Sequence, residues 1–205
     1  MKKDYHPYVF DNGKFVGQFE EMYQNESTEY DSWCQSDLRD YGYLISLAVL
    51  NKYNFNRVLD VGCGKGLFTS LLKKQNNFVL GVDASTTAIQ KARASFKDVE
   101  FQTLLINQDL LADNYAWIFM EYKNFDLIVL KEVLSYIKGW RSILEQSAKF
   151  TKYIFISLDL PATPIGFVKS FEELVVEVRL YYEILVQVEI KTTGNQMLIL
   201  GKVKK

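Results

Sequence analysis

Cysteine and histidine are scarce in this chain of 205 residues. The two cysteines are Cys34 and Cys63, and the single histidine is His6, close to the N-terminus. A structural zinc site takes about four such ligands, so no metal is expected. Two cysteines do not form a disulfide framework either, which makes a reducing cytoplasm the expected location.

Long apolar runs and an excess of one charge are also missing. No uncharged apolar run approaches the roughly 18 residues of a membrane-spanning helix, and no apolar segment follows Lys2 and Lys3 as in a secretory signal. The formal net charge is -1, and the terminal "GKVKK", the closest approach to a basic cluster, is expected to be a solvated tail. We therefore expect neither a membrane nor a nucleic-acid partner.

Short apolar runs alternate with helical patterns along most of the chain. At a length of 205 residues, one domain with a substantial core is expected. Continuous apolar strands separated by helices indicate a parallel sheet that is covered on both faces. The predicted strands are 57–62, 78–83, 99–106, 125–130 and 153–158, and the predicted helices are 37–52, 67–74, 86–96 and 140–148.

The helix predicted for 37–52 has apolar side chains at about 3.6-residue spacing, which predicts one buried face. A second helix, over 86–96, has a capping residue in Ser85. The side chains expected on the buried face of the first helix are Leu38, Tyr41, Ile45, Ala48 and Val49.

The C-terminal part changes character. Ser170 and Glu173 have the spacing of a capping box at the start of a helix. Apolar and polar residues then alternate over 184–191, "TTGNQ" offers a turn, and "MLILGKV" reads as a returning strand. The sequence thus predicts an α/β fold, Rossmann-like and doubly wound, with a mostly parallel seven-stranded sheet that ends in an antiparallel hairpin.

Glycine is concentrated at one strand-to-helix junction. Of eleven glycines, Gly62, Gly64 and Gly66 fall within five positions. Glycine allows positive φ and lets a ligand approach the main chain, and open α/β sheets bind ligands at the carboxyl ends of their strands. A tight turn without a ligand is the alternative. Compared with the dinucleotide-binding pattern G-x-G-x-x-G, Gly66 comes one place early. The carboxylate of Asp60, two residues before the first glycine, would favour a ligand that carries an ammonium group.

The segment "LDVGCGKG" resembles the first motif of class I S-adenosylmethionine-dependent methyltransferases. This resemblance implies S-adenosylmethionine as cofactor, with Asp83 on the ribose hydroxyls, Asp109 on the adenine amino group and the Leu110 N–H on a ring nitrogen. "FDLIVLKEVLSYI" resembles the family's fourth-strand motif. The cofactor-binding residues implied are Asp60, Gly62, Cys63, Gly64, Gly66, Asp83, Ala84, Asp109, Leu110 and Leu130.

The resemblance has one departure, because many small-molecule members have a histidine where this chain has Tyr136. A base is needed only if the methyl acceptor must lose a proton. Glu132 and Tyr136 are the candidate catalytic residues, and the alternative is that Glu132 opens a helical turn and Tyr136 packs. Cys63 is expected to act through its backbone, with a reactive thiol as the alternative.

The methyl acceptor is expected to be a small molecule, with a sugar or glycan precursor among the candidates, methylated on O or N. The fourth motif lacks an Asn/Asp-Pro-Pro-aromatic run, and no Pro-Cys pair is present, which argues against DNA bases. Residues 1–36 are expected to form a lid or cap, and 37–205 the methyltransferase domain. In the lid, Tyr30 and Trp33 are expected to bind substrate, although these aromatics could instead staple the first helix to the sheet.

Two other functions stay open from the sequence. One is a nicotinamide-dependent oxidoreductase, which the position of Gly66 and the reversed terminal hairpin disfavour. The other is a non-catalytic partner subunit that keeps the fold for its surface. The N-terminal segment and first motif are also similar to methyltransferases of the nodulation protein S type and to sugar methyltransferases. The oligomeric state is not predicted.

Overall fold

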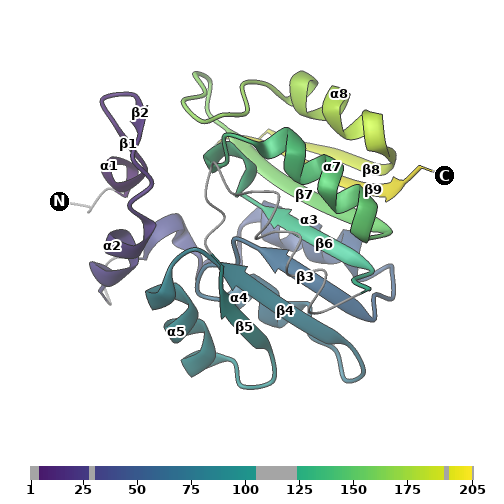
Figure 1. Cartoon of the computed structure of the whole chain (residues 1–205), viewed down its shortest axis with the longest axis horizontal. Helices are drawn as coiled ribbons and strands as arrows, with labels where there is room; N and C mark the ends of the chain where they lie inside the picture. The colour runs from purple at the N-terminus through teal and green to yellow at the C-terminus, as the bar shows by residue number, and fades with distance from the viewer. Residues whose placement is uncertain (1–4, 28–30, 105–123, 192–193, 205) are drawn as a thin grey trace.

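The computed structural model describes residues 5–27, 31–104, 124–191 and 194–204 (Figure 1). Its helices are α1 (His6–Val9), α2 (Phe19–Gln24), α3 (Tyr41–Leu50), α4 (Leu67–Leu71), α5 (Thr86–Ser95), α7 (Trp140–Phe150) and α8 (Phe171–Tyr181), with short 3-10 turns η1 (Ser32–Cys34) and η2 (Leu134–Tyr136). Its strands are β1 (Phe10–Asp11), β2 (Lys14–Phe15), β3 (Arg57–Val61), β4 (Phe78–Asp83), β5 (Glu100–Thr103), β6 (Leu127–Lys131), β7 (Tyr153–Leu160), β8 (Tyr182–Lys191) and β9 (Asn195–Val203).

A seven-stranded sheet with the order β5-β4-β3-β6-β7-β9-β8 forms the centre of the described structure. The first five strands in this order are parallel, whereas β9 pairs antiparallel with both β7 and β8. The predicted fold and terminal hairpin are confirmed. The sequence did not indicate that the last strand, β9, lies inside the sheet while β8 forms the edge.

One face of the sheet is covered by α7 and α8, which lie in front of it in Figure 1. Trp140, Ile143 and Leu144 of α7 pack in this core together with Leu174 and Val178 of α8. Both helices follow the predicted pattern, and the Ser170 hydroxyl caps α8 by accepting a hydrogen bond from the Glu173 N–H.

The opposite face is covered by α3, α4 and α5. The predicted capping of α5 is confirmed, because the Ser85 hydroxyl accepts from the Ala88 N–H at 3.1 Å. The predicted face of α3 is partly wrong. Ile45 and Val49 pack against this core as predicted, whereas Leu38, Tyr41 and Ala48 are exposed. The buried residues of α3 are Gly42, Tyr43, Ser46 and Leu50. The small Gly42 and Ser46 allow close approach to the sheet, which apolar periodicity alone does not reveal.

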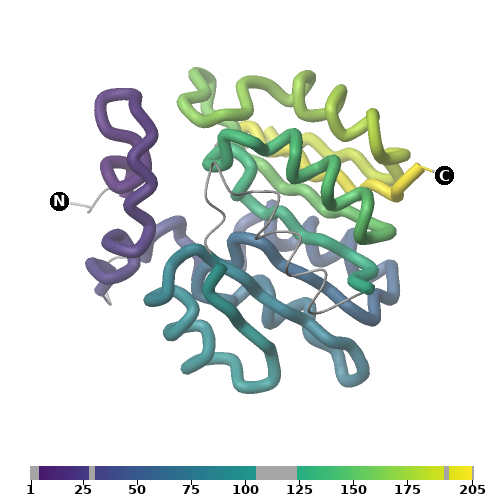
Figure 2. Tube along the Cα trace, in the orientation of Figure 1, coloured from purple at the N-terminus to yellow at the C-terminus, as the bar shows by residue number. Residues whose placement is uncertain are grey.

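The N-terminal segment, which we define as residues 5–27 and 31–36, lies beyond the carboxyl ends of the parallel strands (Figures 1 and 2). It contains α1, the β1–β2 hairpin, α2 and η1. Met22 and Tyr23 of α2 are buried against Ala88 of α5, so the segment is attached to the sheet through α5. The domain boundary predicted at residues 36/37 stays a prediction. None of the helices in the described ranges is long and apolar enough to cross a membrane.

Candidate functional site

The loop between β3 and α4 has a backbone that requires glycine. Gly62, Gly64 and Gly66 have φ values of +75°, +54° and +82°, which side chains rarely adopt. A Cβ at Gly62 would also lie 2.6 Å from the side chain of Val133, and one at Gly66 would lie 2.6 Å from the ring of Phe101. The clustered glycines are therefore a conformational requirement of this loop.

Asp83, the last residue of β4, holds the loop in place. Its carboxylate accepts hydrogen bonds from the Gly64 N–H and the Ser85 N–H, both at 2.9 Å. Burial raises the pKa of Asp83, as does the nearby Glu20, whereas the backbone donors oppose the rise. The carboxylate also lines the adjacent cavity, as a ribose-binding residue would.

Asp60 is almost completely buried below the same loop, with 2% of its surface exposed. The Thr69 hydroxyl donates to its carboxylate at 2.6 Å. Burial raises the pKa of Asp60 to about 7, against the opposing effects of Thr69 and Lys131. A carboxyl group held in this way favours a cation beside it.

Lys131, at the end of β6, is a site residue that sequence reasoning missed. Its ammonium lies 4.3 Å from the ring centroid of Tyr43 and 5.7 Å from that of Phe68. None of the described carboxylates forms an ion pair with it. A charged residue that ends an otherwise apolar strand was the available signal.

Glu132 follows Lys131 with a left-handed backbone, φ +55°. Its carboxylate accepts from the Ser157 hydroxyl at 2.6 Å, the Asp159 N–H at 2.6 Å and the Gln196 amide at 2.7 Å. These contacts join the ends of β6, β7 and β9, so they favour an anchoring role. Its predicted role as a base stays a prediction.

Tyr136 lies at the centre of an aromatic cluster. Its ring centroid is 5.0 Å from that of Trp33, 6.0 Å from Phe19 and 6.2 Å from Phe10. Burial raises the pKa of Tyr136, and the charges of Glu132 and Asp159 raise it further. The phenol therefore stays protonated at neutral pH and is better suited to donate a hydrogen bond than to act as a base.

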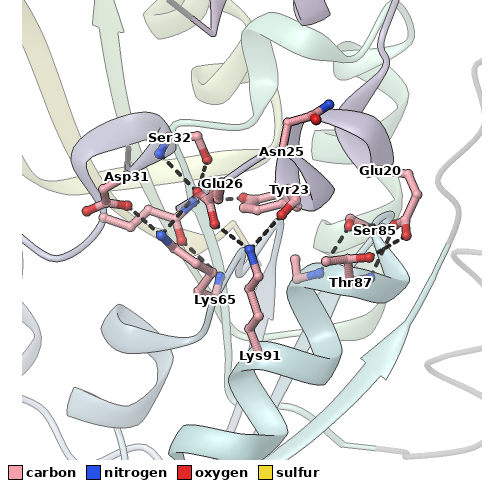
Figure 3. A network of polar contacts seen from close by, with 12 residues as sticks. Glu20, Tyr23, Asn25, Glu26, Asp31, Ser32, Lys65, Ser85, Thr87 and Lys91 are labelled. Carbon is pink, nitrogen blue, oxygen red and sulfur yellow. Dashed lines mark hydrogen bonds and ion pairs between the residues drawn. The ribbon is translucent and has the colours of Figure 1, made fainter. Parts of the chain in front are cut away.

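Polar contacts bind the N-terminal segment to the loop and to α5 (Figure 3). Glu26 forms ion pairs with Lys65 at 3.1 Å and Lys91 at 2.8 Å. The Glu20 carboxylate accepts hydrogen bonds from the hydroxyls of Ser85 and Thr87, each at 2.6 Å. Ser85 stands two residues after Asp83 in the chain. The segment is thus tied to the same elements that carry Asp83 and the glycines.

A cavity of about 790 Å³ lies between the N-terminal segment and the carboxyl ends of the strands. Of the predicted site residues, Asp60, Gly62, Cys63, Asp83, Ala84, Glu132, Tyr136 and Trp33 line it. Gly64 and Gly66 shape the loop without lining the cavity, and the Leu130 side chain is fully buried in the core instead. Tyr30, Asp109 and Leu110 lie outside the described residues.

A family model described as "Methyltransferase domain" matches residues 54–177. The chain belongs to this methyltransferase family. The predicted membership of the S-adenosylmethionine-dependent family is confirmed, and the match favours it over the nicotinamide-dependent alternative.

Curated relatives support the same family. The ubiquinone biosynthesis O-methyltransferase of Pasteurella multocida (strain Pm70) is 32% identical over 111 residues, which are 49% of this chain and 45% of the relative. The enzyme of the same name from Histophilus somni (strain 2336) is 26% identical over 100 residues, 47% of this chain and 40% of the relative. The chain spans less than half the length of these relatives.

Solved structures confirm the fold. The N-methyltransferase NodS from Bradyrhizobium japonicum WM9, in complex with S-adenosyl-L-homocysteine, has a TM-score of 0.70 at 16% identity, covering 95% of this chain and 100% of that one. The N-terminal domain of EvdMO1 with S-adenosylhomocysteine bound has a TM-score of 0.60 at 14% identity, and the match covers 80% of this chain and 81% of that one.

Proposed function

We propose that this protein is a methyltransferase that transfers the methyl group of S-adenosylmethionine to O or N of a small molecule. Family membership supports the reaction class. The observation that carries the proposal is the placement of Asp60, Asp83 and Lys131 on the wall of one cavity, at the carboxyl ends of β3, β4 and β6.

These three side chains match the charges of the cofactor. Its methionine end carries an ammonium group, which suits the buried Asp60, and a carboxylate, which suits the ammonium of Lys131. The Asp83 carboxylate is suited to two adjacent ribose hydroxyls. The sulfonium supplies the activated methyl group, and the chain supplies binding and alignment.

We propose a small-molecule acceptor, with a sugar or glycan precursor among the candidates, and no nucleic-acid or membrane partner. A cavity of about 790 Å³ falls within the range of small-molecule sites. The N-terminal segment covers it with aromatic side chains, and these suit the apolar face of a ring. The free Cys34 and Cys63 agree with the reducing cytoplasm that we propose as the location.

Calorimetric titration tests the cofactor assignment. We expect the protein to bind S-adenosylhomocysteine and not NADH. Asp83→Ala should weaken binding by about 1–3 kcal/mol, the range for hydrogen bonds to a charged group. Asp98→Ala, at an exposed position, is the matched control and should leave the affinity unchanged. Binding of NADH alone, or equal affinities in the two variants, would contradict the proposal.

A further inference from the structure

Asp159 is a cavity residue that the cofactor assignment does not use. It lies near the end of β7, and its backbone N–H donates to Glu132. Asp159 lines the cavity, and its carboxylate has no hydrogen bond or ion pair with any side chain in the described parts of the chain. This carboxylate is therefore available to a ligand.

Ser135 provides an independent sign of a ligand. Only 8% of its surface is exposed, and its hydroxyl has no hydrogen-bond partner within the described structure, although the residue lines the same cavity. An unpaired buried hydroxyl is costly, and the cost is relieved if a polar ligand group binds there.

Aromatic rings form the adjacent wall. Trp33 and Tyr136, with ring centroids 5.0 Å apart, both line the cavity. Asp159 lies close enough to Tyr136 for its charge to raise the pKa of the phenol. Aromatic faces attract organic cations, and a carboxylate beside them adds a charge-assisted hydrogen bond.

The charges of the cavity also favour a cation. Five carboxylates belong to the described residues that line the cavity. Among all these lining residues, Lys131 is the sole lysine or arginine. The cofactor has a net charge of only +1 and leaves an excess of carboxylates. This excess opposes an anionic acceptor. The five carboxylates are Asp40, Asp60, Asp83, Glu132 and Asp159.

We propose that the methyl acceptor is an amine, bound in its ammonium form by Asp159 against the rings of Trp33 and Tyr136. This inference rests on the proposed function and names its substrate class. A neutral alcohol or phenol is the competing acceptor, and it would bring no positive charge to offset the carboxylate excess.

The reaction then requires one proton to leave the ammonium group, and Asp159 takes it. Partial burial raises the pKa of Asp159, and the neighbouring carboxylates Glu132 and Asp40 raise it further, which favours proton uptake. The nitrogen lone pair forms the new N–C bond while the C–S bond of the cofactor breaks and its electron pair stays on sulfur. The products are a methylammonium ion and a neutral thioether.

The test measures binding to the protein loaded with S-adenosylhomocysteine, using three probes of similar shape and different charge. These are benzylammonium, benzyl alcohol and benzoate. We expect benzylammonium to bind at least about tenfold more tightly than benzyl alcohol, and benzoate most weakly. Asp159→Asn should remove most of this preference. Glu183→Gln, on the exposed side of β8, is the matched control and should keep it.

The affinity for S-adenosylhomocysteine distinguishes a failure of the proposed function from a failure of the amine assignment. If the wild-type protein does not bind it, the proposed function fails. If it binds but benzylammonium does not bind more tightly than benzyl alcohol, or Asp159→Asn keeps the full preference, the amine assignment alone is overturned. Trp33→Leu gives a second test, since it should weaken benzylammonium binding more than benzyl alcohol binding.

Discussion

Replacement of Asp60 by asparagine should make the cofactor-free protein more stable. Asp60 is 2% exposed and its pKa is raised to about 7, from an ordinary value of 3.8. Its folded form therefore binds a proton more tightly than the unfolded chain does. Folding takes up this proton between about pH 4 and 7, so the contribution of Asp60 to stability falls as pH rises through that window and is constant above it.

The size of the effect follows from the two pKa values. At about 1.4 kcal/mol per pH unit, the gap between 3.8 and about 7 corresponds to about 4 kcal/mol of destabilisation at pH 8. Asparagine keeps an oxygen that can accept from the Thr69 hydroxyl, and the pKa of about 7 already includes the attraction between Asp60 and Lys131. We therefore expect Asp60→Asn to stabilise the protein by about 2–4 kcal/mol at pH 8.

Urea unfolding of both proteins between pH 5 and pH 8 measures this difference. The gain should be about 3 kcal/mol smaller at pH 5, because wild-type Asp60 is then protonated in the folded state. The same variant should bind S-adenosylhomocysteine more weakly, since the ammonium group loses its carboxylate. Glu100→Gln, exposed at the start of β5, is the control. A stability difference that does not change with pH would refute the reasoning.

Two further variants test other contacts of the site. Lys131→Met keeps the apolar stem against Tyr43 but removes the ammonium group. In calorimetry it should weaken S-adenosylhomocysteine binding more than about tenfold, while binding of the decarboxylated analogue of this ligand stays unchanged. Equal losses for both ligands would exclude the carboxylate contact. Glu26→Gln removes the ion pairs to Lys65 and Lys91 and should speed amide hydrogen exchange in α2. The control Glu21→Gln should leave this exchange unchanged. Unchanged exchange in Glu26→Gln would show that these ion pairs do not hold the N-terminal segment in place.

The sequence predicted those parts of the site that depend on local backbone geometry. The three glycines adopt positive φ, and few other residues can do so, which is why the loop is recognisable from residue types alone. Asp60 and Asp83 were predictable because they stand at fixed distances from that loop. Both line the cavity, and their roles in cofactor binding stay predictions.

Residues that meet only through the sheet were not predictable in this way. Lys131 is the last residue of β6 and Asp159 is the last but one of β7. Pairing of Lys131 with Ser157 places these strand ends side by side. The position of β9 next to β7 then brings Gln196 to Glu132. Strand order is set by long-range packing, so no spacing within the sequence indicates these contacts.

Residues with a strained backbone lie at or next to the cavity. Among described residues other than glycine, five have positive φ. Asn12 and Asn124 are of a type that tolerates it, whereas Trp33, Cys34 and Glu132 are not. Trp33 and Glu132 line the cavity, and Cys34 follows Trp33 directly. Such strain costs about 1–3 kcal/mol for each residue and persists only where surrounding contacts enforce it. The hydrogen bonds of Glu132 and the ring contacts of Trp33 supply that enforcement, so the fold itself fixes this part of the cavity wall.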